Sequence, residues 1–332
     1  MADAYTVLVI GTGFGKHYDR IISQINQDSQ YPGVKVNKLI VTKTDLVEAQ
    51  EFAAALVTKG IEIEIIGAQI SKESDLDAIM NQYSPTFVAI AAQDKETGDN
   101  IHRTYAEIAL KYDCTKAVLV EKPFMNANGD RRSLEAIMNL HSTARGRLGV
   151  ELPHYFMGRE MQKHEEISGL LKNAKELEFY WGTKGNNPNI IDDLALHPWS
   201  LLPDFYKLKS ASYTHLSNDY TLVEAVYSYH DRDINVKMHL MHKDKNFNGI
   251  KIDNRNFVIV IDLLNNNNLV EIEERLSPRS ETINSHAKGA PLIIVENPLK
   301  KHIYQALSGN IVCGYDIIYK SQEFLEMAHI KK

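Results

Sequence analysis

The sequence predicts an α/β protein with an N-terminal, doubly wound parallel sheet, followed by an α+β domain with an open, mainly antiparallel sheet. Three observations lead to this fold class. Strand-like and helix-like segments alternate up to about residue 153, a glycine-rich turn follows the first strand, and strands joined directly to one another dominate the second half. We therefore expect two domains, over residues 1–153 and 154–332.

In the first domain, short apolar runs rich in β-branched residues predict strands, and periodic apolar positions between them predict helices. The expected strands are Val7–Ile10, Val36–Thr42, Ile61–Ile66, Phe87–Ala91, Ala117–Glu121 and Leu148–Leu152. The expected helices are Tyr18–Asn26, Asp45–Lys59, Ser74–Tyr83, Asn100–Tyr112 and Asp130–Ser142. Because parallel neighbours need crossover connections, and these are usually helices, this alternation predicts a parallel sheet covered on both faces.

In the second domain, two helices are expected over Glu160–Leu171 and Asp192–Leu202, and a closing helix over Gln322–Ile330. The expected strands are Ala211–Leu216, Thr221–Ser228, Val236–His242, Phe257–Leu264 and Leu269–Leu276. Four asparagines, 265–268, separate the last two strands and favour a hairpin. Directly connected strands of this kind form a mainly antiparallel sheet, while the segment 180–189 receives no assignment.

The composition is that of a soluble globular protein, with 44% hydrophobic and 24% charged residues among 332. A net charge of −6 without basic clusters argues against a nucleic-acid partner. Cys114 and Cys313 have neither the number nor the spacing of a disulfide framework or a zinc site. No basic leader and no apolar run of about 18 residues is present, so we expect a cytoplasmic protein outside the membrane.

The glycine-rich turn is Gly11-Thr12-Gly13-Phe14-Gly15, placed between the first strand and the first helix. A dinucleotide-binding fold places glycines there for a sharp turn, for close approach of backbone to a pyrophosphate, and for helix packing. The third glycine arrives one residue earlier than in the strict pattern. An ordinary glycine-rich turn therefore remains an alternative at this point.

The fifth strand ends in Glu121-Lys122-Pro123. In open α/β sheets the ligand crevice lies outside the carboxyl ends of the strands, so Lys122 is expected to point toward it. A cation at that place could hold or protonate a substrate oxygen during hydride transfer. The alternative is a surface lysine at a strand end. Pro123 is a candidate for a cis peptide bond in the turn.

Asp193 and His197 are four residues apart, so on a helix they share one face. A carboxylate beneath an imidazole orients the ring and makes the pair suited to proton exchange. Two alternatives compete: Asp192 or Asp193 caps the helix, or Asp193 and His197 bind a metal. No third ligand has a suitable spacing, and strand alternation places His239 and His242 on opposite faces, so we expect no metal site.

Taken together, the glycine turn, the "EKP" segment and the Asp-x-x-x-His segment resemble those of the glucose-fructose oxidoreductase/inositol dehydrogenase/rhizopine catabolism (Gfo/Idh/MocA) family. The resemblance covers nearly the whole chain and implies an NAD(P)-dependent oxidoreductase that acts on a small polar substrate such as a sugar or cyclitol. It implies that Lys122 is the catalytic lysine, that Asp193 positions substrate or base, and that His197 is the acid/base.

Three departures bear on the substrate. Ala195 stands where the family commonly has glycine, Pro198-Trp199 where aliphatic residues are usual, and the glycine spacing is compressed. The segment "GTGFGKHY" is also similar to a branch that reduces thiazolinyl imines. A ligand sensor without catalysis, and a dehydrogenase for amino acids or imines, are further alternatives.

The cofactor is expected to be NADP, with NAD as the alternative. Where an NAD site normally presents a carboxylate at the end of the second strand, this chain has Thr42-Lys43-Thr44, and Lys43 could pair with a 2′-phosphate. NAD would instead use Asp45 for the ribose. The remaining residues that we expect to contact the cofactor are Ala92, Gln93, Glu121, Lys122 and Pro123.

A homodimer or homotetramer is expected through the second domain's sheet. The run 257–261 is apolar at every position, so both faces of this strand need to be covered.

Overall fold

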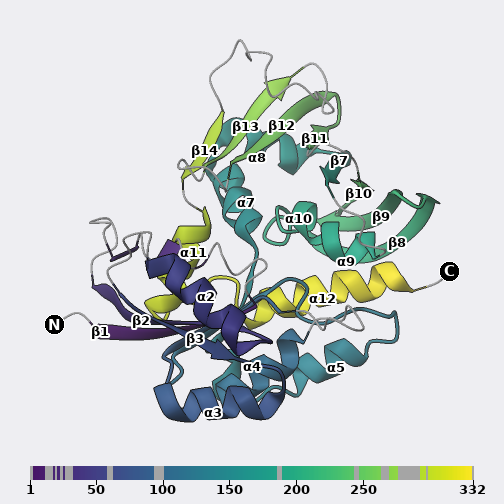
Figure 1. The fold of residues 1–332 in the computed structure, drawn as a ribbon. Coiled ribbons are helices and arrows are strands. Elements are labelled where there is room, and N and C mark those ends of the chain that lie inside the picture. Colours follow the sequence, from purple (N-terminus) through teal and green to yellow (C-terminus); the bar gives the residue numbers. More distant parts are fainter. Residues whose placement is uncertain are drawn as a thin grey trace. The chain divides into compact units, whose positions relative to one another are not determined.

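A computed structural model describes residues 3–11, 18, 21–22, 25–26, 33–57, 63–92, 101–184, 189–242, 247–262, 269–275, 292–296 and 298–330. The chain forms two compact units, and most of their elements are labelled in Figure 1. The first unit comprises residues 1–126, 138–151 and 300–318, and the second comprises 127–137, 152–299 and 319–332. The domain boundary expected at residue 153 lies close to a boundary between the units at residue 151. The first unit also includes residues 300–318, and the second also includes residues 127–137.

The first unit is built on a parallel sheet. In the described part of this unit the sheet has six strands in the order β3-β2-β1-β4-β5-β6, and all neighbours run parallel. The strands are β1 (Asp3–Ile10), β2 (Val34–Lys43), β3 (Glu64–Gln69), β4 (Phe87–Ile90), β5 (Ala117–Glu121) and β6 (Leu148–Glu151). The predicted doubly wound sheet is confirmed, although β3 begins later than expected.

Burial of the central strands explains their continuous apolar sequence. Every residue of Phe87–Ile90 has 0% of its surface exposed, as have Val7, Leu8 and Val9 of β1. Such strands are covered on both faces by helices, and therefore lack the alternation of polar and apolar residues seen in half-exposed strands. The helices of this unit include α2 (Leu46–Val57), α3 (Glu73–Tyr83), α4 (His102–Leu110) and α6 (Ser142–Arg145).

The helix expected over Asp130–Ser142 is shorter than predicted. The structure has α5 (Arg132–Met138) and α6, separated by residues with other conformations. His141 takes extended backbone angles at the start of α6, and its ring accepts a hydrogen bond from the backbone N–H of Thr143. A new helix start at this point ends the first helix early.

The second unit contains a larger sheet that is mainly antiparallel. Within the described residues its eight strands follow the order β14-β13-β12-β11-β7-β10-β9-β8, and only the pairing of β7 with β10 is parallel. The strands are β7 (Glu176–Thr183), β8 (Lys207–Ser217), β9 (Tyr220–Tyr229), β10 (Arg232–His242), β11 (Phe247–Ile252), β12 (Arg255–Asp262), β13 (Leu269–Arg275) and β14 (Ile293–Glu296). The mainly antiparallel character is confirmed.

Helices of this unit pack on one face of that sheet. They include α7 (Pro153–Lys163), α8 (Glu165–Asn173), α9 (Ile190–Leu194) and α10 (Leu196–Trp199). Two further helices, α11 (Pro298–Leu307) and α12 (Tyr315–His329), each contain a limit between the units. None of the described helices is both long and apolar enough to cross a membrane.

The opposite face of β7 is charged. Glu176 and Glu178 alternate with buried apolar residues, and each carboxylate pairs with a lysine of a neighbouring strand. The distances are 2.7 Å for Lys237–Glu176 and 2.6 Å for Lys251–Glu178. In β12, Val258 is only 9% exposed. An oligomer formed through this sheet stays a prediction.

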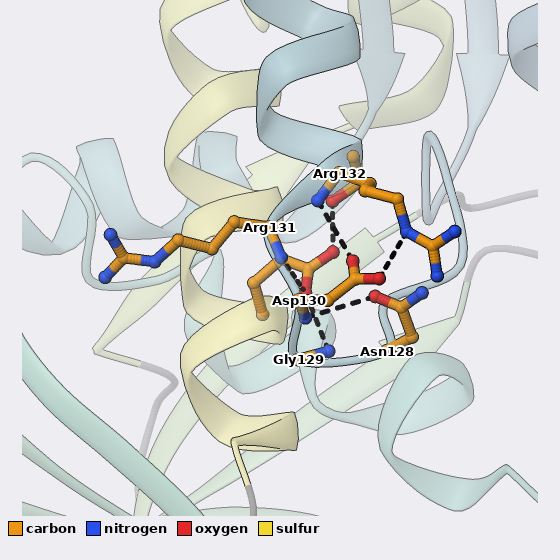
Figure 2. A network of polar contacts seen from close by, with 7 residues as sticks. Asn128, Gly129, Asp130, Arg131 and Arg132 are labelled. Carbon is orange, nitrogen blue, oxygen red and sulfur yellow. Dashed lines mark hydrogen bonds and ion pairs between the residues drawn. The ribbon is translucent and has the colours of Figure 1, made fainter.

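A buried carboxylate holds α12 to the loop before α5, as Figure 2 shows in part. Glu326 is 1% exposed and accepts hydrogen bonds from the backbone N–H groups of Gly129, at 2.8 Å, and Arg131, at 3.3 Å, and from the Ser133 hydroxyl. Gly129 has a positive φ of 78°, and a Cβ there would lie 2.7 Å from the carbonyl oxygen of His329. Only glycine therefore allows this close approach.

Candidate functional site

The carboxyl ends of β1 and β4 meet where the glycine turn begins. Gly11 has a φ of 89°, and a Cβ on it would lie 2.5 Å from the carbonyl oxygen of Ala91. This position therefore accepts only glycine, and it places backbone without side chains beside Ala91 and Ala92. The other predicted residues of this region, Thr12, Gly13, Phe14, Gly15 and Gln93, lie outside the described residues.

At the end of β2, the predicted cofactor residues have different surroundings. Thr42 is buried, and its hydroxyl donates to the carbonyl of Val9 at 3.2 Å, so this side chain bonds β2 to β1. Lys43 is partly exposed, and its Nζ lies 3.7 Å from Oε2 of Glu48. Asp45 caps α2, because its Oδ1 accepts the backbone N–H of Glu48 at 2.9 Å. Lys43 is thus a partly exposed cation with the carboxylate of Glu48 close by, and the sequence analysis did not predict this neighbour.

The turn after β5 contains the predicted cis peptide bond, between Lys122 and Pro123. Two hydrogen bonds hold this turn: the Glu121 carboxylate accepts the N–H of Lys122 at 2.8 Å, and Nδ1 of His102 contacts the Pro123 carbonyl at 2.8 Å. The pKa of His102 is lowered to about 4, mainly by burial and to a smaller extent by the nearby charge of Lys122, while the bond to Pro123 offsets part of this effect. His102 is therefore neutral, and its Nδ1–H donates to the carbonyl.

A second glutamate stands next to this turn. Glu151 at the end of β6 is the register partner of Glu121, and it is 1% exposed. Burial raises its pKa to about 8, so at neutral pH the carboxyl group is mainly protonated. The Tyr18 hydroxyl donates to it. Neither Tyr18 nor Glu151 was predicted as a site residue, because the sequence separates them by more than a hundred positions.

In the second unit, Asp193 and His197 lie on two successive short helices, α9 and α10, rather than on one. Pro198 has no N–H, so it cannot continue the hydrogen bonds to the preceding turn. Asn189 takes the N-cap position of α9, where its side chain accepts the N–H of Asp192 at 3.4 Å. Neither aspartate is therefore the cap of this helix.

Each of the two aspartates faces a histidine of another element. Oδ1 of Asp192 lies 3.1 Å from Nε2 of His329 on α12, and Oδ2 of Asp193 lies 3.5 Å from Nε2 of His242 on β10. On the other face of the sheet, His239 stacks on Tyr180 with ring centroids 4.6 Å apart. His239 and His242 therefore take opposite faces, as the alternation predicted. The expected pairing of Asp193 with His197 stays a prediction.

His197 belongs to a cluster of three rings, which we call the His154–Trp181–His197 cluster. The indole of Trp181 stacks on His197, with ring centroids 5.7 Å apart and an angle of 7° between planes. His154 stands perpendicular to both rings, with centroids 5.0 Å from each, and its Nδ1 lies 3.3 Å from Nδ1 of His197. His154 and Trp181 are each 3% exposed, whereas His197 is partly exposed.

Sequence reasoning missed His154 and Trp181 for different reasons. Trp181 lies in the segment that received no assignment, although the alternation of Glu176 and Glu178 with apolar residues is a strand signal. His154 follows Pro153 at the start of α7, and nothing in its local sequence indicates that it meets a residue 43 positions away. The structure describes Lys122 in the first unit, and Asp193 and His197 in the second.

Comparisons with known proteins give similarities in structure. No protein-family model matches the sequence, and neither does any curated protein sequence. Among solved structures, UDP-N-acetylglucosamine 3-dehydrogenase GnnA from Acidithiobacillus ferrooxidans matches with a TM-score of 0.61 and 15% identity, covering 99% of this chain and 97% of that one. KijD10, a 3-ketoreductase from Actinomadura kijaniata in complex with NADP, matches with a TM-score of 0.62 and 13% identity, covering 99% and 96%.

A third similar structure is an NAD-binding oxidoreductase from Klebsiella pneumoniae, with a TM-score of 0.64 and 12% identity, covering 98% of this chain and 96% of that one. At such identities the likeness is one of fold, and it extends over both units. The chain therefore has the fold of these oxidoreductases, which confirms the architecture implied by its resemblance to the Gfo/Idh/MocA family.

Proposed function

We propose that this protein is an NAD(P)-dependent oxidoreductase that transfers a hydride to or from a small polar substrate, with sugars and cyclitols as the favoured class. The observation that carries the proposal is the carboxyl edge of the parallel sheet. There Gly11 leaves no room for a side chain beside Ala91, and two strands away β5 ends in the Lys122–Pro123 turn held by His102. Similarity to GnnA and KijD10, which are named as sugar dehydrogenase and ketoreductase, supports the proposal.

The residues at this edge fit a dinucleotide. Gly11 lets the turn after β1 pass close to the backbone of Ala91 and Ala92 at the end of β4. The carboxyl ends of parallel strands are where open α/β sheets bind dinucleotides. The bound nicotinamide would supply or accept the hydride. Lys122 would polarise the substrate oxygen or nitrogen, and His197 would exchange a proton with it.

The proposed cofactor is NADP, with NAD as the alternative. Lys43 is a partly exposed cation at the end of β2, suited to a 2′-phosphate. Asp45, the residue that would serve an NAD ribose, accepts a backbone N–H of α2 instead. These two observations support NADP.

The experiment is a screen followed by substitution. Purified protein is mixed with NADPH or NADH and a panel of keto-sugars, oxidised cyclitols and cyclic imines, and cofactor oxidation is measured. With any substrate found, Lys122→Ala and His197→Ala should each lower kcat by about 10²- to 10⁴-fold, because a positioned acid or cation acts mainly on the transition state. NADPH affinity should stay within a few fold.

Lys209→Ala and His141→Ala are the matched controls, since Lys209 is half-exposed in an ion pair on β8 and His141 is exposed before α6. Both should keep normal turnover. If Lys122→Ala and His197→Ala also keep it, the assigned catalytic residues are wrong. If NADPH binds but the panel gives no reaction, a ligand sensor becomes the better description.

A further inference from the structure

The contact between His154 and His197 joins two like nitrogens. Nδ1 of His154, near the start of α7, lies 3.3 Å from Nδ1 of His197 on α10. A hydrogen bond between two imidazole nitrogens exists only when one of them carries the hydrogen and the other offers its lone pair. The protonation of one ring therefore fixes the role of the other.

Trp181 holds this geometry in place. Its indole is parallel to the His197 ring and perpendicular to the His154 ring, so it limits rotation of both imidazoles. Trp181 belongs to β7, which pairs with β10 on one side and β11 on the other, and it is 3% exposed. A ring packed against such a residue has little freedom to leave its rotamer.

We propose that His154 is a positioning residue for His197: the two rings share one hydrogen at their Nδ1 atoms, and His197 takes part in the reaction through Nε2. This inference rests on the proposed function, because it concerns the acid/base histidine of that reaction. His154 supplies what the sequence predicted for Asp193, a partner that fixes the orientation and tautomer of the imidazole.

The shared hydrogen limits the charge of the pair. If both rings were fully protonated, two N–H groups would face each other at the contact, and two positive charges would stand together in a buried place. The pair can therefore hold one extra proton and keep the hydrogen bond, whereas a second one would break it. With one extra proton the pair carries a single positive charge and has one proton to donate. Reduction of a C=O or C=N group by hydride transfer requires one proton.

Other titratable groups near α10 are already paired. Oδ2 of Asp193 on α9 lies 3.5 Å from Nε2 of His242 on β10. Oδ1 of Asp192 lies 3.1 Å from Nε2 of His329 on α12. Two ring contacts in the described part of the chain lie beside them: Trp181 of β7 stacks on His197, and Phe324 of α12 stacks on Trp199. His154 is thus the titratable group that the structure places against Nδ1 of His197.

The test uses the full-length protein labelled with ¹⁵N-histidine and needs no substrate. In the wild type, NMR should show a scalar coupling across the hydrogen bond between the two Nδ1 atoms, and one tautomer of neutral His197. His154→Phe removes the nitrogen but keeps a ring, so the coupling should disappear, His197 should populate both tautomers, and its titration should move by about one pH unit.

Two further variants complete the test. In His154→Asn the side-chain oxygen lies near the former Nδ1 and can accept from His197, so a single tautomer should return. His239→Phe removes a histidine from the opposite face of the same sheet and should leave the His197 signals unchanged. Far-ultraviolet circular dichroism verifies folding, and the wild-type coupling together with His154→Asn decides the question if His154→Phe does not fold.

Activity provides a second readout once a substrate is known. His154→Phe should lower kcat by about 10- to 100-fold and shift its pH profile, with little change in KM, while His154→Asn should recover most of the loss. A wild type without the coupling, or a His154→Phe protein with an unchanged His197 tautomer and titration, overturns the proposal. If instead the coupling is present but His197→Ala keeps full turnover, the catalytic role assigned to His197 is wrong, and the positioning role of His154 falls with it, although the hydrogen bond stands. If NADPH binds but the panel gives no reaction, the proposed function fails while the coupling can still be present.

Discussion

Lys43 at the end of β2 combines a partly exposed cation with an exposed carboxylate, Glu48, at 3.7 Å. An ion pair between such exposed groups stabilises a protein little, by about 0–1 kcal/mol. Lys43 can therefore exchange Glu48 for a phosphate at small cost, and a phosphate offers a stronger, charge-assisted hydrogen bond. Glu48 also repels a nearby 2′-phosphate, so the two side chains act on cofactor choice in opposite directions.

From this arrangement we predict that NADPH binds more tightly than NADH and that two variants shift the ratio oppositely. Lys43→Asp should weaken NADPH binding by about 10- to 150-fold, the equivalent of about 1.5–3 kcal/mol for a charged hydrogen bond. Glu48→Gln should strengthen it a few fold, and NADH binding should change little in either variant. Calorimetric titration of both cofactors measures these affinities.

Lys38→Asp serves as the control, because Lys38 lies on the same strand and pairs with Glu64 at 3.2 Å. Its cofactor ratio should equal that of the wild type. Equal affinities for both cofactors in the wild type, or a preference for NADH, would remove the argument from Lys43.

Local sequence predicted some site residues and could not reach others. Gly11 belongs to a short motif, so its place after the first strand was predictable, whereas the motif made Pro123 only a candidate for the cis bond that the structure has. His102, His154 and Glu151 act on residues far away along the chain, and such neighbours become visible only when the fold brings them together. No periodicity or spacing around these three residues carries that information.

At the scale of elements, buried parallel strands were predicted best. β5 has the expected limits, Ala117–Glu121, because a short apolar run between turn residues has few other solutions. Errors arose where local chemistry interrupts a pattern: Pro198 divides the helix expected over Asp192–Leu202, and the helix expected over Asp130–Ser142 ends at Met138, before a new start after His141. The sequence analysis did not predict the strands β7, β11 and β14 or the helix α11.

The hydrogen bonds that tie α12 to the loop before α5 are another contact between elements that could not be predicted from the sequence. Glu326 accepts two backbone N–H groups and the Ser133 hydroxyl while 1% exposed. Around it, Asp130 accepts the N–H of Arg132 at 3.0 Å, and Asn128 accepts that of Asp130 at 3.2 Å (Figure 2). Removing the central carboxylate leaves buried donors without their acceptor, which costs more than the loss of an exposed ion pair.

We therefore predict that Glu326→Ala lowers the free energy of unfolding of the second unit by about 2–4 kcal/mol. Urea unfolding followed by tryptophan fluorescence measures it, because both tryptophans, Trp181 and Trp199, lie in this unit. Glu323→Ala, on the same helix, should change stability by less than about 1 kcal/mol. Similar losses in the two variants would show that the tie contributes no special stability.

For the molecule as a whole, pH acts on the first unit through three buried groups. Burial lowers the pKa of His102 and of His302 from 6.5 to about 4, and raises the pKa of Glu151 from 4.5 to about 8. Between pH 4 and 6.5 the unfolded chain binds more protons at the two histidines, so their contribution to stability rises with pH. Between pH 4.5 and 8 the folded state keeps the Glu151 proton that the unfolded chain releases, so this contribution falls with pH.

Below pH 6.5 the two histidines outweigh the glutamate, and of these three groups Glu151 is the one that still titrates above pH 6.5. We therefore predict that the first unit is most stable near pH 6.5 and loses about 2 kcal/mol between pH 6.5 and 8. Glu151→Gln keeps an acceptor for the Tyr18 hydroxyl but removes the proton, so the decline above pH 6.5 should vanish. Pulsed hydrogen exchange in urea, read on peptides from β4 and β5, measures this unit separately.

Glu73→Gln, an exposed position in the first turn of α3, is the matched control and should keep the wild-type pH profile. Below pH 6.5, Glu151→Gln should make stability rise more steeply with pH than in the wild type, since the opposing slope of one proton is gone. A wild-type first unit whose stability stays level or rises from pH 6.5 to 8 would contradict a buried, protonated Glu151 beside the Lys122–Pro123 turn. If Glu151 does ionise near pH 8, a buried negative charge appears at the edge of the sheet proposed to bind the cofactor phosphates, so NADPH should bind more weakly at pH 8 than at pH 6.5, and Glu151→Gln should remove this difference.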